Sequence, residues 1–372
     1  MNRVFFDLSS FLFWSEESLD NKRLISKDGV IDTNGAISMD GSDIDPEVRE
    51  MLRLLSDAGF SINVCDTVPA SHIREVLSNA GIQEHFELIV SSEDTKALAE
   101  NLKKLRRPGD FSIFVGSNED VIEAADQAKI PTVAYGMDTR AIWDKTFCTA
   151  RNPLSVQDQI YTWKMVHEIA TAAISKGVRV LGIDGMEFAG KTFFVDKLSR
   201  YFDLLGKDNT IIDTEDFRRG KEARYKGEDM GEAFYMNGYN FEKLIDEVLV
   251  PFKRDGMLDT VVYCVDIEEE AFVNEIPYKV SEDGIMILEG SMMYRDPLLQ
   301  YFDMTVYMRV DYKEAEHRAT LEETPIYGED PSEVLNDKII PAQKLYRARH
   351  DPFINRDFVI DNSNYHRPFF IV

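Results

Sequence analysis

One short string constrains this sequence more than any other. Gly185-Met-Glu-Phe-Ala-Gly190-Lys191-Thr192 fits the pattern G-x-x-x-x-G-K-[ST] at every fixed position. A β-branched apolar run, residues 178–183, precedes it, and apolar side chains at helical spacing follow it between residues 193 and 201. The string therefore predicts a strand, a tight loop and a helix in succession, which is the repeating unit of an α/β fold.

The chemistry of this string points to a phosphate. Glycines let the backbone wrap an anion, while exposed N–H groups and the start of a helix attract its negative charge. Lys191 would offset the charge of the β- and γ-phosphates of ATP, and the Thr192 hydroxyl would hold Mg²⁺. We therefore expect ATP and Mg²⁺ as cofactors. The residues expected to contact ATP are Gly185, Phe188, Ala189, Gly190, Lys191 and Thr192.

Two further acidic elements follow the loop in the sequence. Glu215 and Asp216 come after the apolar pair 211–212, at the expected end of a second strand, and Glu289 ends the apolar run 285–288. The carboxyl ends of strands in an open parallel sheet line the ligand crevice. One acid of the first pair is placed to accept the proton of an attacking hydroxyl, and only one, because neighbouring strand residues point to opposite faces. Glu289 has the placement of an acid in the Mg²⁺ shell.

These three elements, in this order, resemble the uridine kinase/phosphoribulokinase family of P-loop kinases over residues 178–372. The pairs Asp184-Gly185 and Arg224-Tyr225 extend the similarity. The resemblance implies that Asp216, or its neighbour Glu215, is the catalytic base. The residues that it implies on the acceptor side are Glu215, Arg218, Arg224, Tyr225 and Arg295.

The lid helix of that family carries Arg-x-x-Arg-Asp, and this chain matches it only in part. Arg318 matches the first arginine, whereas Leu321 replaces the second. The resemblance implies that Arg318 offsets charge on the transferring phosphoryl group together with Lys191. The catalytic set expected here is Lys191, Asp216, Glu289 and Arg318, with Thr192 and Glu289 as the metal ligands.

The first part of the chain also alternates between strand and helix patterns. Apolar runs occur near residues 3–7, 60–64, 86–90, 111–115 and 132–135, and helical patterns near 46–58, 71–79, 94–105 and 120–128. This alternation predicts a second doubly wound parallel sheet. The expected organisation is α/β with two such domains, residues 1–150 and 177–372, joined by a helix in residues 151–176.

Residues 1–140 resemble the haloacid dehalogenase (HAD) superfamily of phosphatases. Asp7 lies where that family has its nucleophile, after the first apolar strand. Most of the remaining chemistry is missing: Ser9 replaces the acid/base aspartate, and the metal-binding acids fall at Ser117 and Val121, with Asp120 only adjacent. We expect a vestigial site at Asp7 and Asp120 without phosphatase activity, in a domain kept for packing, ligand sensing or homo-oligomerisation.

Composition limits the partners. The formal net charge is −25, opposite in sign to the basic surface that a nucleic-acid binder needs. The three cysteines are widely spaced and show no metal-ligand or disulfide pattern, which favours a reducing cytoplasm. No apolar run is long enough to cross a membrane.

The function expected from the sequence is transfer of the ATP γ-phosphoryl group to a hydroxyl of a small metabolite, with a nucleoside or sugar suggested by the resemblance alone. Two alternatives stay open. One is a bifunctional polynucleotide kinase/phosphatase, which the lost HAD carboxylates and the acidic charge disfavour. The other is a nucleotide-binding regulatory or scaffold protein with little turnover, which the missing lid arginine permits.

Overall fold

The computed structural model describes residues 1–11, 25–26, 29–30, 46–107, 109–135, 146–266, 272–322, 330–365 and 367–371. The chain divides into two compact units, Met1–Lys164 and Met165–Val372. The division falls inside α5 (Pro153–Ser175), a continuous helix of 23 residues, and the domain limits expected from the sequence lie near its two ends. Among the described residues, no helix is both long and apolar enough to span a membrane.

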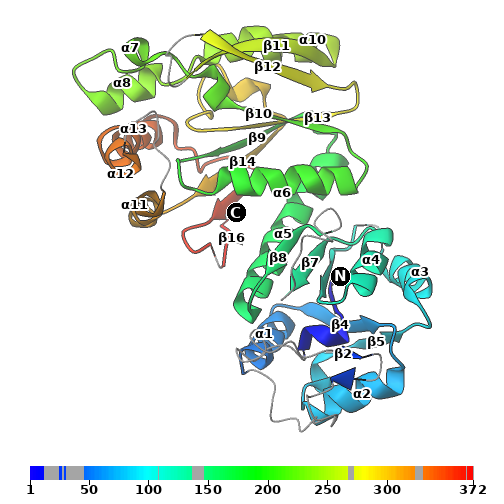
Figure 1. The fold of residues 1–372 in the computed structure, drawn as a ribbon. Helices are drawn as coiled ribbons and strands as arrows, with labels where there is room; N and C mark the ends of the chain where they lie inside the picture. The colour runs from blue at the N-terminus through cyan, green and yellow to red at the C-terminus, as the bar shows by residue number, and fades with distance from the viewer. Residues whose placement is uncertain are drawn as a thin grey trace. The chain divides into compact units, whose positions relative to one another are not determined.

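The first unit is built on a six-stranded sheet in the order β5-β4-β1-β6-β7-β8 (Figure 1). Its strands are β1 (Asn2–Phe6), β4 (Phe60–Asp66), β5 (Leu88–Ser91), β6 (Ser112–Gly116), β7 (Thr132–Tyr135) and β8 (Cys148–Ala150). All neighbouring strands are parallel. The chain leaves β1 toward one edge and then returns to build toward the other, so the doubly wound arrangement predicted from the sequence is confirmed.

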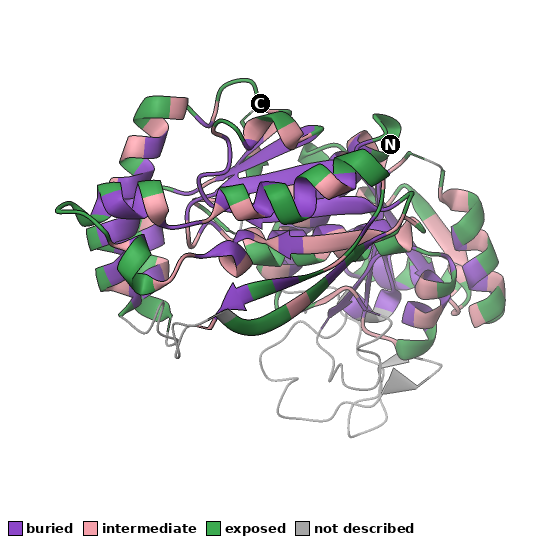
Figure 2. Cartoon of the chain, turned by 90° about the horizontal axis from the view of Figure 1, so that it is seen from above, coloured by how far each residue is buried: buried purple, intermediate pink, exposed green. Residues whose placement is uncertain are grey.

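Helices cover this sheet because their apolar residues recur at helical spacing. They are α1 (Pro46–Asp57), α2 (Ala70–Asn79), α3 (Thr95–Leu105) and α4 (Glu119–Gln127), with short 3-10 turns η1 (Leu8–Phe11) and η3 (Gln83–His85) and a small pair β2 (Ile25–Ser26) and β3 (Gly29–Val30). In α1, for example, Val48, Met51, Leu52 and Leu55 are buried. Figure 2 shows helices with one buried and one exposed side, and strands that are mostly buried.

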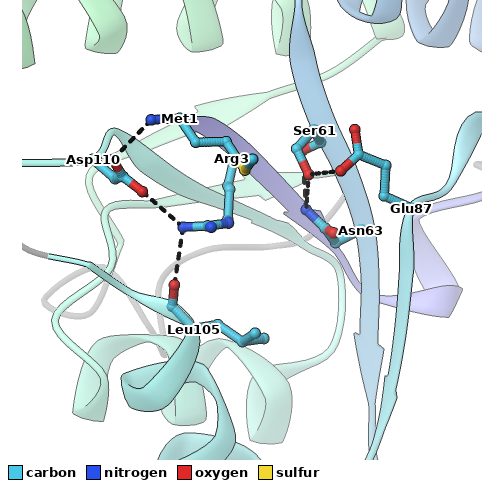
Figure 3. Close-up of polar contacts among 7 residues, drawn as sticks. All are labelled: Met1, Arg3, Ser61, Asn63, Glu87, Leu105 and Asp110. Carbon is cyan, nitrogen blue, oxygen red and sulfur yellow. Dashed lines mark hydrogen bonds and ion pairs between the residues drawn. The ribbon is translucent and has the colours of Figure 1, made fainter.

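A small polar cluster fixes the amino end of β1 (Figure 3). Arg3, 6% exposed, donates to Asp110 Oδ2 at 3.0 Å and to the Leu105 carbonyl oxygen at 3.0 Å. The Met1 ammonium group bonds to the other oxygen of Asp110 at 2.8 Å. A buried guanidinium needs such partners, so this cluster ties β1 to the segment between α3 and β6.

The second unit has a six-stranded sheet in the order β10-β13-β9-β14-β15-β16. Its strands are β9 (Val180–Gly185), β10 (Asn209–Asp213), β13 (Ile285–Gly290), β14 (Met304–Arg309), β15 (Phe358–Asp361) and β16 (Phe369–Phe370). All pairs are parallel except β15–β16. The central strand β9 lies between β13 and β14, so a ligand crevice is expected where β9 ends.

The surrounding elements are α6 (Lys191–Leu204), η5 (Thr214–Phe217), α7 (Lys221–Arg224), α8 (Met230–Asn237), α9 (Phe241–Leu244), α10 (Val250–Asp255), η7 (Leu299–Tyr301), α11 (Tyr312–Leu321), α12 (Pro331–Val334) and α13 (Ile340–His350). Figure 1 shows α8, α12 and α13 gathered at one end of the sheet. A two-stranded antiparallel hairpin, β11 (Leu258–Val265) with β12 (Phe272–Val280), was not predicted from the sequence.

Two helices of this unit contain a π-helical segment just before a proline. The segment η6 (Ile245–Leu249) joins α9 to α10, and η8 (Leu335–Ile339) joins α12 to α13. Pro251 and Pro341 follow within two residues. Proline has no N–H and its ring crowds the preceding turn, so a locally wider turn lets each helix continue through it.

Candidate active site

The phosphate loop, residues 185–192, connects the central strand β9 to α6. Gly190 closes it with φ = +83°, a conformation that L side chains rarely adopt. A Cβ atom at this position would also lie 2.7 Å from Asn362 Nδ2, which donates to the Ala189 carbonyl oxygen at 2.8 Å. Glycine is therefore required here both for the turn and for the approach of Asn362.

Lys191 and Thr192 begin α6, as the sequence predicted. The Lys191 ammonium group folds back over the loop and donates to the Met186 carbonyl oxygen at 3.0 Å. Thr192 is exposed in the first turn of the helix. The loop thus presents a cation, a hydroxyl and a helix start at the carboxyl edge of the sheet, which together suit a polyphosphate.

Two carboxylates end the neighbouring strands. Asp213 closes β10 and lies directly opposite Glu289 on β13. Gly290 follows Glu289 and lets the turn after β10 pack closely against β13, because a Cβ at Gly290 would lie 1.9 Å from Thr214 Oγ1. The predicted position of Glu289 at a strand end is confirmed. Asp213 was missed, because the expected strand end was placed too late in the sequence.

Burial is the largest cause of the raised pKa values of Asp213 and Glu289. It raises the pKa of Glu289 to about 7, with a further rise from Asp213 and an opposing effect of Lys191. Burial, followed by the charge of Glu215, raises the pKa of Asp213 to about 6. Glu289 is 4% exposed, and its Oε2 atom has no hydrogen-bond partner among the described residues. An unpaired buried carboxylate oxygen is a natural place for a cation.

No group of three or more His, Cys, Asp and Glu side chains in the described part of the chain forms a metal cage. Mg²⁺ is usually held by one or two protein oxygens and completes its shell with phosphate oxygens and water. The strand-end acid Glu289 and the hydroxyl of Thr192 suit that pattern.

Glu289→Gln should stabilise the metal-free protein at alkaline pH. The pKa of Glu289 in the folded state, about 7, exceeds its ordinary value of 4.5, so the stability this group contributes is present below pH 4.5 and lost as the pH rises through 7. We expect the free energy of unfolding of the variant to exceed that of wild type by about 1–3 kcal/mol at pH 8.5, and by little at pH 4.5.

Urea unfolding followed by far-UV circular dichroism would measure this difference. The control is Glu282→Gln, which removes an exposed carboxylate in the turn before β13 and should change stability by less than about 0.5 kcal/mol. Equal stability of wild type and Glu289→Gln at pH 8.5 would show that ionisation of the buried Glu289 carboxyl group does not destabilise the protein.

The acids Glu215 and Asp216 are not on the strand, contrary to the sequence-based expectation. The strand ends at Asp213, whose side chain accepts a hydrogen bond from the Glu215 backbone N–H at 2.9 Å and turns the chain into η5. The two side chains therefore do not alternate between the faces of the sheet. Glu215 accepts from the Tyr239 hydroxyl at 2.6 Å, and Asp216 accepts from the Tyr278 hydroxyl.

The expected acceptor-side arginines are bonded to the protein. Arg218 pairs with Glu215 at 3.3 Å and is 6% exposed. Arg224 is 1% exposed and donates to the Arg219 carbonyl oxygen at 3.1 Å. Arg295 donates to the Tyr235 carbonyl oxygen at 2.7 Å and lies over the Phe241 ring. Their role in binding an acceptor stays a prediction.

Two cations lie close to the ring of Tyr225. Lys338 Nζ lies 4.3 Å from the centre of its ring, and the Arg224 guanidinium carbon lies 5.2 Å from it. The Tyr225 hydroxyl oxygen is buried and has no hydrogen-bond partner among the described residues. Its role toward an acceptor also stays a prediction.

Arg318 lies against the outside of the phosphate loop. It donates to the carbonyl oxygens of Phe188 at 2.8 Å and Asn362 at 2.6 Å, and it pairs with Glu314 at 2.8 Å. These bonds support the backbone of the loop. The role implied by resemblance, charge compensation at the transferring group, stays a prediction.

A buried network beneath the loop was missed in the sequence. Asp184, 1% exposed, accepts from the Tyr346 hydroxyl at 2.5 Å, and that same hydroxyl accepts from the Tyr294 backbone N–H at 2.8 Å. On the same helix, Gln343 donates to the Ser291 hydroxyl at 2.7 Å. Helix α13 therefore supports both the loop and the end of β13, although nothing in its sequence pattern distinguished these side chains from core residues.

In the first unit, the Asp7 carboxylate is hydrogen-bonded to two loops at the end of the sheet. It is fully buried after β1 and accepts hydrogen bonds from the backbone N–H groups of Ser10, Ser117 and Asn118 at 2.8, 2.8 and 2.9 Å. The Ser10 hydroxyl donates to it at 2.5 Å. Burial raises its pKa to about 6 despite these bonds. Both oxygens thus join the loops after β1 and β6, whereas Asp120 lies exposed on α4.

Asp7→Asn should destabilise the first unit by about 2–4 kcal/mol, because an amide nitrogen would replace an oxygen that faces only donors. All three tryptophans, Trp14, Trp143 and Trp163, belong to this unit, so urea unfolding followed by tryptophan fluorescence reports on it selectively. Asp120→Asn is the matched control, with an expected change below about 0.5 kcal/mol. Equal effects of the two substitutions would show that Asp7 is not structural.

The chain matches no family model and no curated protein. Among solved structures it is similar to a possible uridine kinase from Bacillus stearothermophilus, with 20% identity, a TM-score of 0.42, and coverage of 53% of this chain and 97% of that one. For the D-glycerate 3-kinase of Cryptococcus neoformans these values are 13%, 0.38, 53% and 95%. For a haloacid dehalogenase-like hydrolase of Streptococcus pneumoniae they are 16%, 0.30, 42% and 96%. At identities and TM-scores this low, we draw no conclusion from them about family or activity.

Proposed function

We propose that the second unit is a Mg²⁺-dependent phosphotransferase that moves the γ-phosphoryl group of ATP to a hydroxyl group of a small metabolite. One observation carries the proposal: a complete phosphate loop, with Lys191, connects the central strand to α6, next to the strand-end acids Asp213 and Glu289. The loop and these acidic side chains lie at one edge of the sheet, which supports a polyphosphate site there.

Thr192 and Glu289 would hold Mg²⁺ in this proposal. Once bound there, the metal would supply positive charge that offsets the negative charge developing on the phosphates during transfer. Lys191 would bind the β- and γ-phosphates, and the loop N–H groups would orient them.

In the transfer step, the acceptor oxygen forms a bond to the γ-phosphorus while the bond from that phosphorus to the β–γ bridging oxygen breaks. The electron pair of the broken bond stays with ADP, and the hydroxyl proton moves to the carboxylate of Asp216. Burial raises the pKa of Asp216, while the bond from Tyr278 lowers it. A carboxyl group with a raised pKa is a better proton acceptor.

A nucleoside or sugar-like acceptor rests on the sequence resemblance. The first unit would not act as a phosphatase, because the hydrogen bonds that surround Asp7 leave its oxygens engaged with the protein. A polynucleotide acceptor is disfavoured by the net charge of −25.

ADP release from Mg·ATP, measured with and without a panel of nucleosides and sugars, tests the proposal. We expect at least one acceptor to stimulate ADP release and to gain a phosphate that mass spectrometry detects. ADP release that no acceptor increases would contradict the proposal.

A nucleotide-binding regulatory protein is the second candidate, and the lid region favours it. Arg318 is bonded to the loop backbone and to Glu314, and Leu321 occupies the position of the second lid arginine. Tight Mg·ATP binding without acceptor-stimulated ADP release would support this candidate.

A further inference from the structure

An acidic side chain within the phosphate loop faces the expected acceptor side. Glu187 occupies a variable position of the loop motif, and its Oε1 atom lies 3.3 Å from the Tyr239 hydroxyl. That hydroxyl also donates to Glu215 at 2.6 Å. The Ser291 hydroxyl donates to Glu187 Oε2 at 3.4 Å. Glu187 is therefore turned toward η5 and the end of β13, where an acceptor must approach.

Glu187 belongs to a group that we call the acceptor-side carboxylates: Glu187, Asp213, Glu215, Asp216 and Glu289. Burial is the largest cause of a raised pKa in four of them, and in each of these four the charge of Glu215 raises the pKa further. Glu215 thus lies within electrostatic reach of all the others.

The three arginines expected on the acceptor side are bonded to oxygens of the protein. Arg218 is paired with Glu215 and also donates to the Val265 carbonyl oxygen. Arg224 and Arg295 donate to the carbonyl oxygens of Arg219 and Tyr235. Lys191 lies on the loop, where the phosphates of ATP would take its charge.

A separate observation points to a bound ligand or ion beside this group. Glu289 is 4% exposed, and one of its oxygens has no partner among the described residues. Native proteins seldom leave a buried carboxylate oxygen unpaired unless a ligand or ion completes it.

From this arrangement we propose that Glu187 is a specificity-determining residue, and that the acceptor carries hydroxyl or amino donors but no phosphate or carboxylate group. The inference rests on the proposed function and narrows its substrate class. Ionised carboxylates only accept hydrogen bonds, so a complementary ligand must donate them. An anionic acceptor would face several carboxylates, while Arg218, Arg224 and Arg295 are already bonded to protein oxygens.

Matched pairs of acceptors that differ only by an anionic group provide the test: D-ribose with D-ribose 5-phosphate, uridine with its 5′-monophosphate, and glycerol with glycerate. In every pair that the full-length protein phosphorylates, we expect kcat/KM of the uncharged member to exceed that of the anionic member at least 100-fold.

Glu187→Gln then tests the residue itself, with Glu282→Gln as the control. The glutamine variant should raise KM for the uncharged acceptor at least 10-fold and reduce the preference within the pair at least 10-fold. Its affinity for Mg·ATP should be unchanged or higher, because a negative charge beside the phosphates is removed. Equal melting temperatures of the variants would show that the fold is retained.

Preference for the anionic member in wild type would overturn the inference, as would an unchanged KM in Glu187→Gln. Both outcomes leave the proposed function standing, provided that transfer still depends on Lys191. If none of the acceptors is phosphorylated, the proposed function fails, and this inference fails with it.

Discussion

Lys191→Ala should weaken binding of Mg·ATP by about 10–100-fold and lower kcat/KM for phosphoryl transfer by about 10³-fold or more. The binding loss corresponds to one charge-assisted hydrogen bond to a phosphate. The larger loss in transfer follows because charge on the transferring group grows in the transition state, where a lysine contributes most. Isothermal titration calorimetry and a coupled ADP assay would measure the two quantities.

Arg200→Ala is the control for this experiment, since it removes an exposed cation from the same helix, α6. It should change neither quantity more than about 2-fold, in line with other surface substitutions. If Lys191→Ala bound Mg·ATP and transferred phosphate like wild type, the loop would not be a nucleotide site and the proposed function would be wrong.

Asp216→Asn should lower kcat about 10²–10⁴-fold while the Kd for Mg·ATP changes by less than about 3-fold. Loss of a general base slows the chemical step, whereas Lys191, Thr192 and the loop N–H groups still hold the phosphates. Asparagine keeps the shape of the side chain and can still accept a hydrogen bond from the Tyr278 hydroxyl. The effect on kcat is therefore expected to arise from chemistry rather than from altered packing.

Substitutions of two neighbouring acids, compared with Asp216→Asn, identify which carboxylate is the base. Glu215→Gln removes the carboxylate that is paired with Arg218, and Asp213→Asn removes the strand-end acid beside Glu289. If Glu215→Gln abolished turnover while Asp216→Asn kept it, the base would be Glu215. Loss only in Asp213→Asn would move the base to the strand end, and retention in all three would show that the acceptor is activated elsewhere.

Local sequence patterns were sufficient for the phosphate loop and for most of the elements around it. The motif at residues 185–192 and the apolar run before Glu289 could be interpreted without knowledge of distant contacts. In both places the end of the strand is visible in the sequence as the point where the apolar run stops. The two doubly wound sheets follow from the alternation of such patterns.

Features that depend on a side-chain cap or on distant contacts were not recoverable from the apolar patterns. The strand β10 ends at Asp213 because that carboxylate caps the next turn, a choice that the apolar pattern does not encode. The short strands β8 and β16 exist only through pairing with neighbours. The bonds of Arg218 to Val265 and of Arg318 to Phe188 join residues distant in the sequence, so charge and position alone did not reveal them. The ligand contacts expected of these arginines stay predictions.

The π-helical turn before Pro341 sets the direction in which the side chains of α13 point. Each residue of a regular α-helix advances the side chain by about 100° around the axis, so one residue more or fewer redirects every side chain that follows. Deleting one residue from Leu335–Ile339 would remove the wider turn and rotate α13 by about 100° relative to α12. Gln343 and Tyr346 would then rotate away from Ser291 and Asp184. The residues beneath the phosphate loop would lose these two hydrogen bonds although neither Gln343 nor Tyr346 had been substituted.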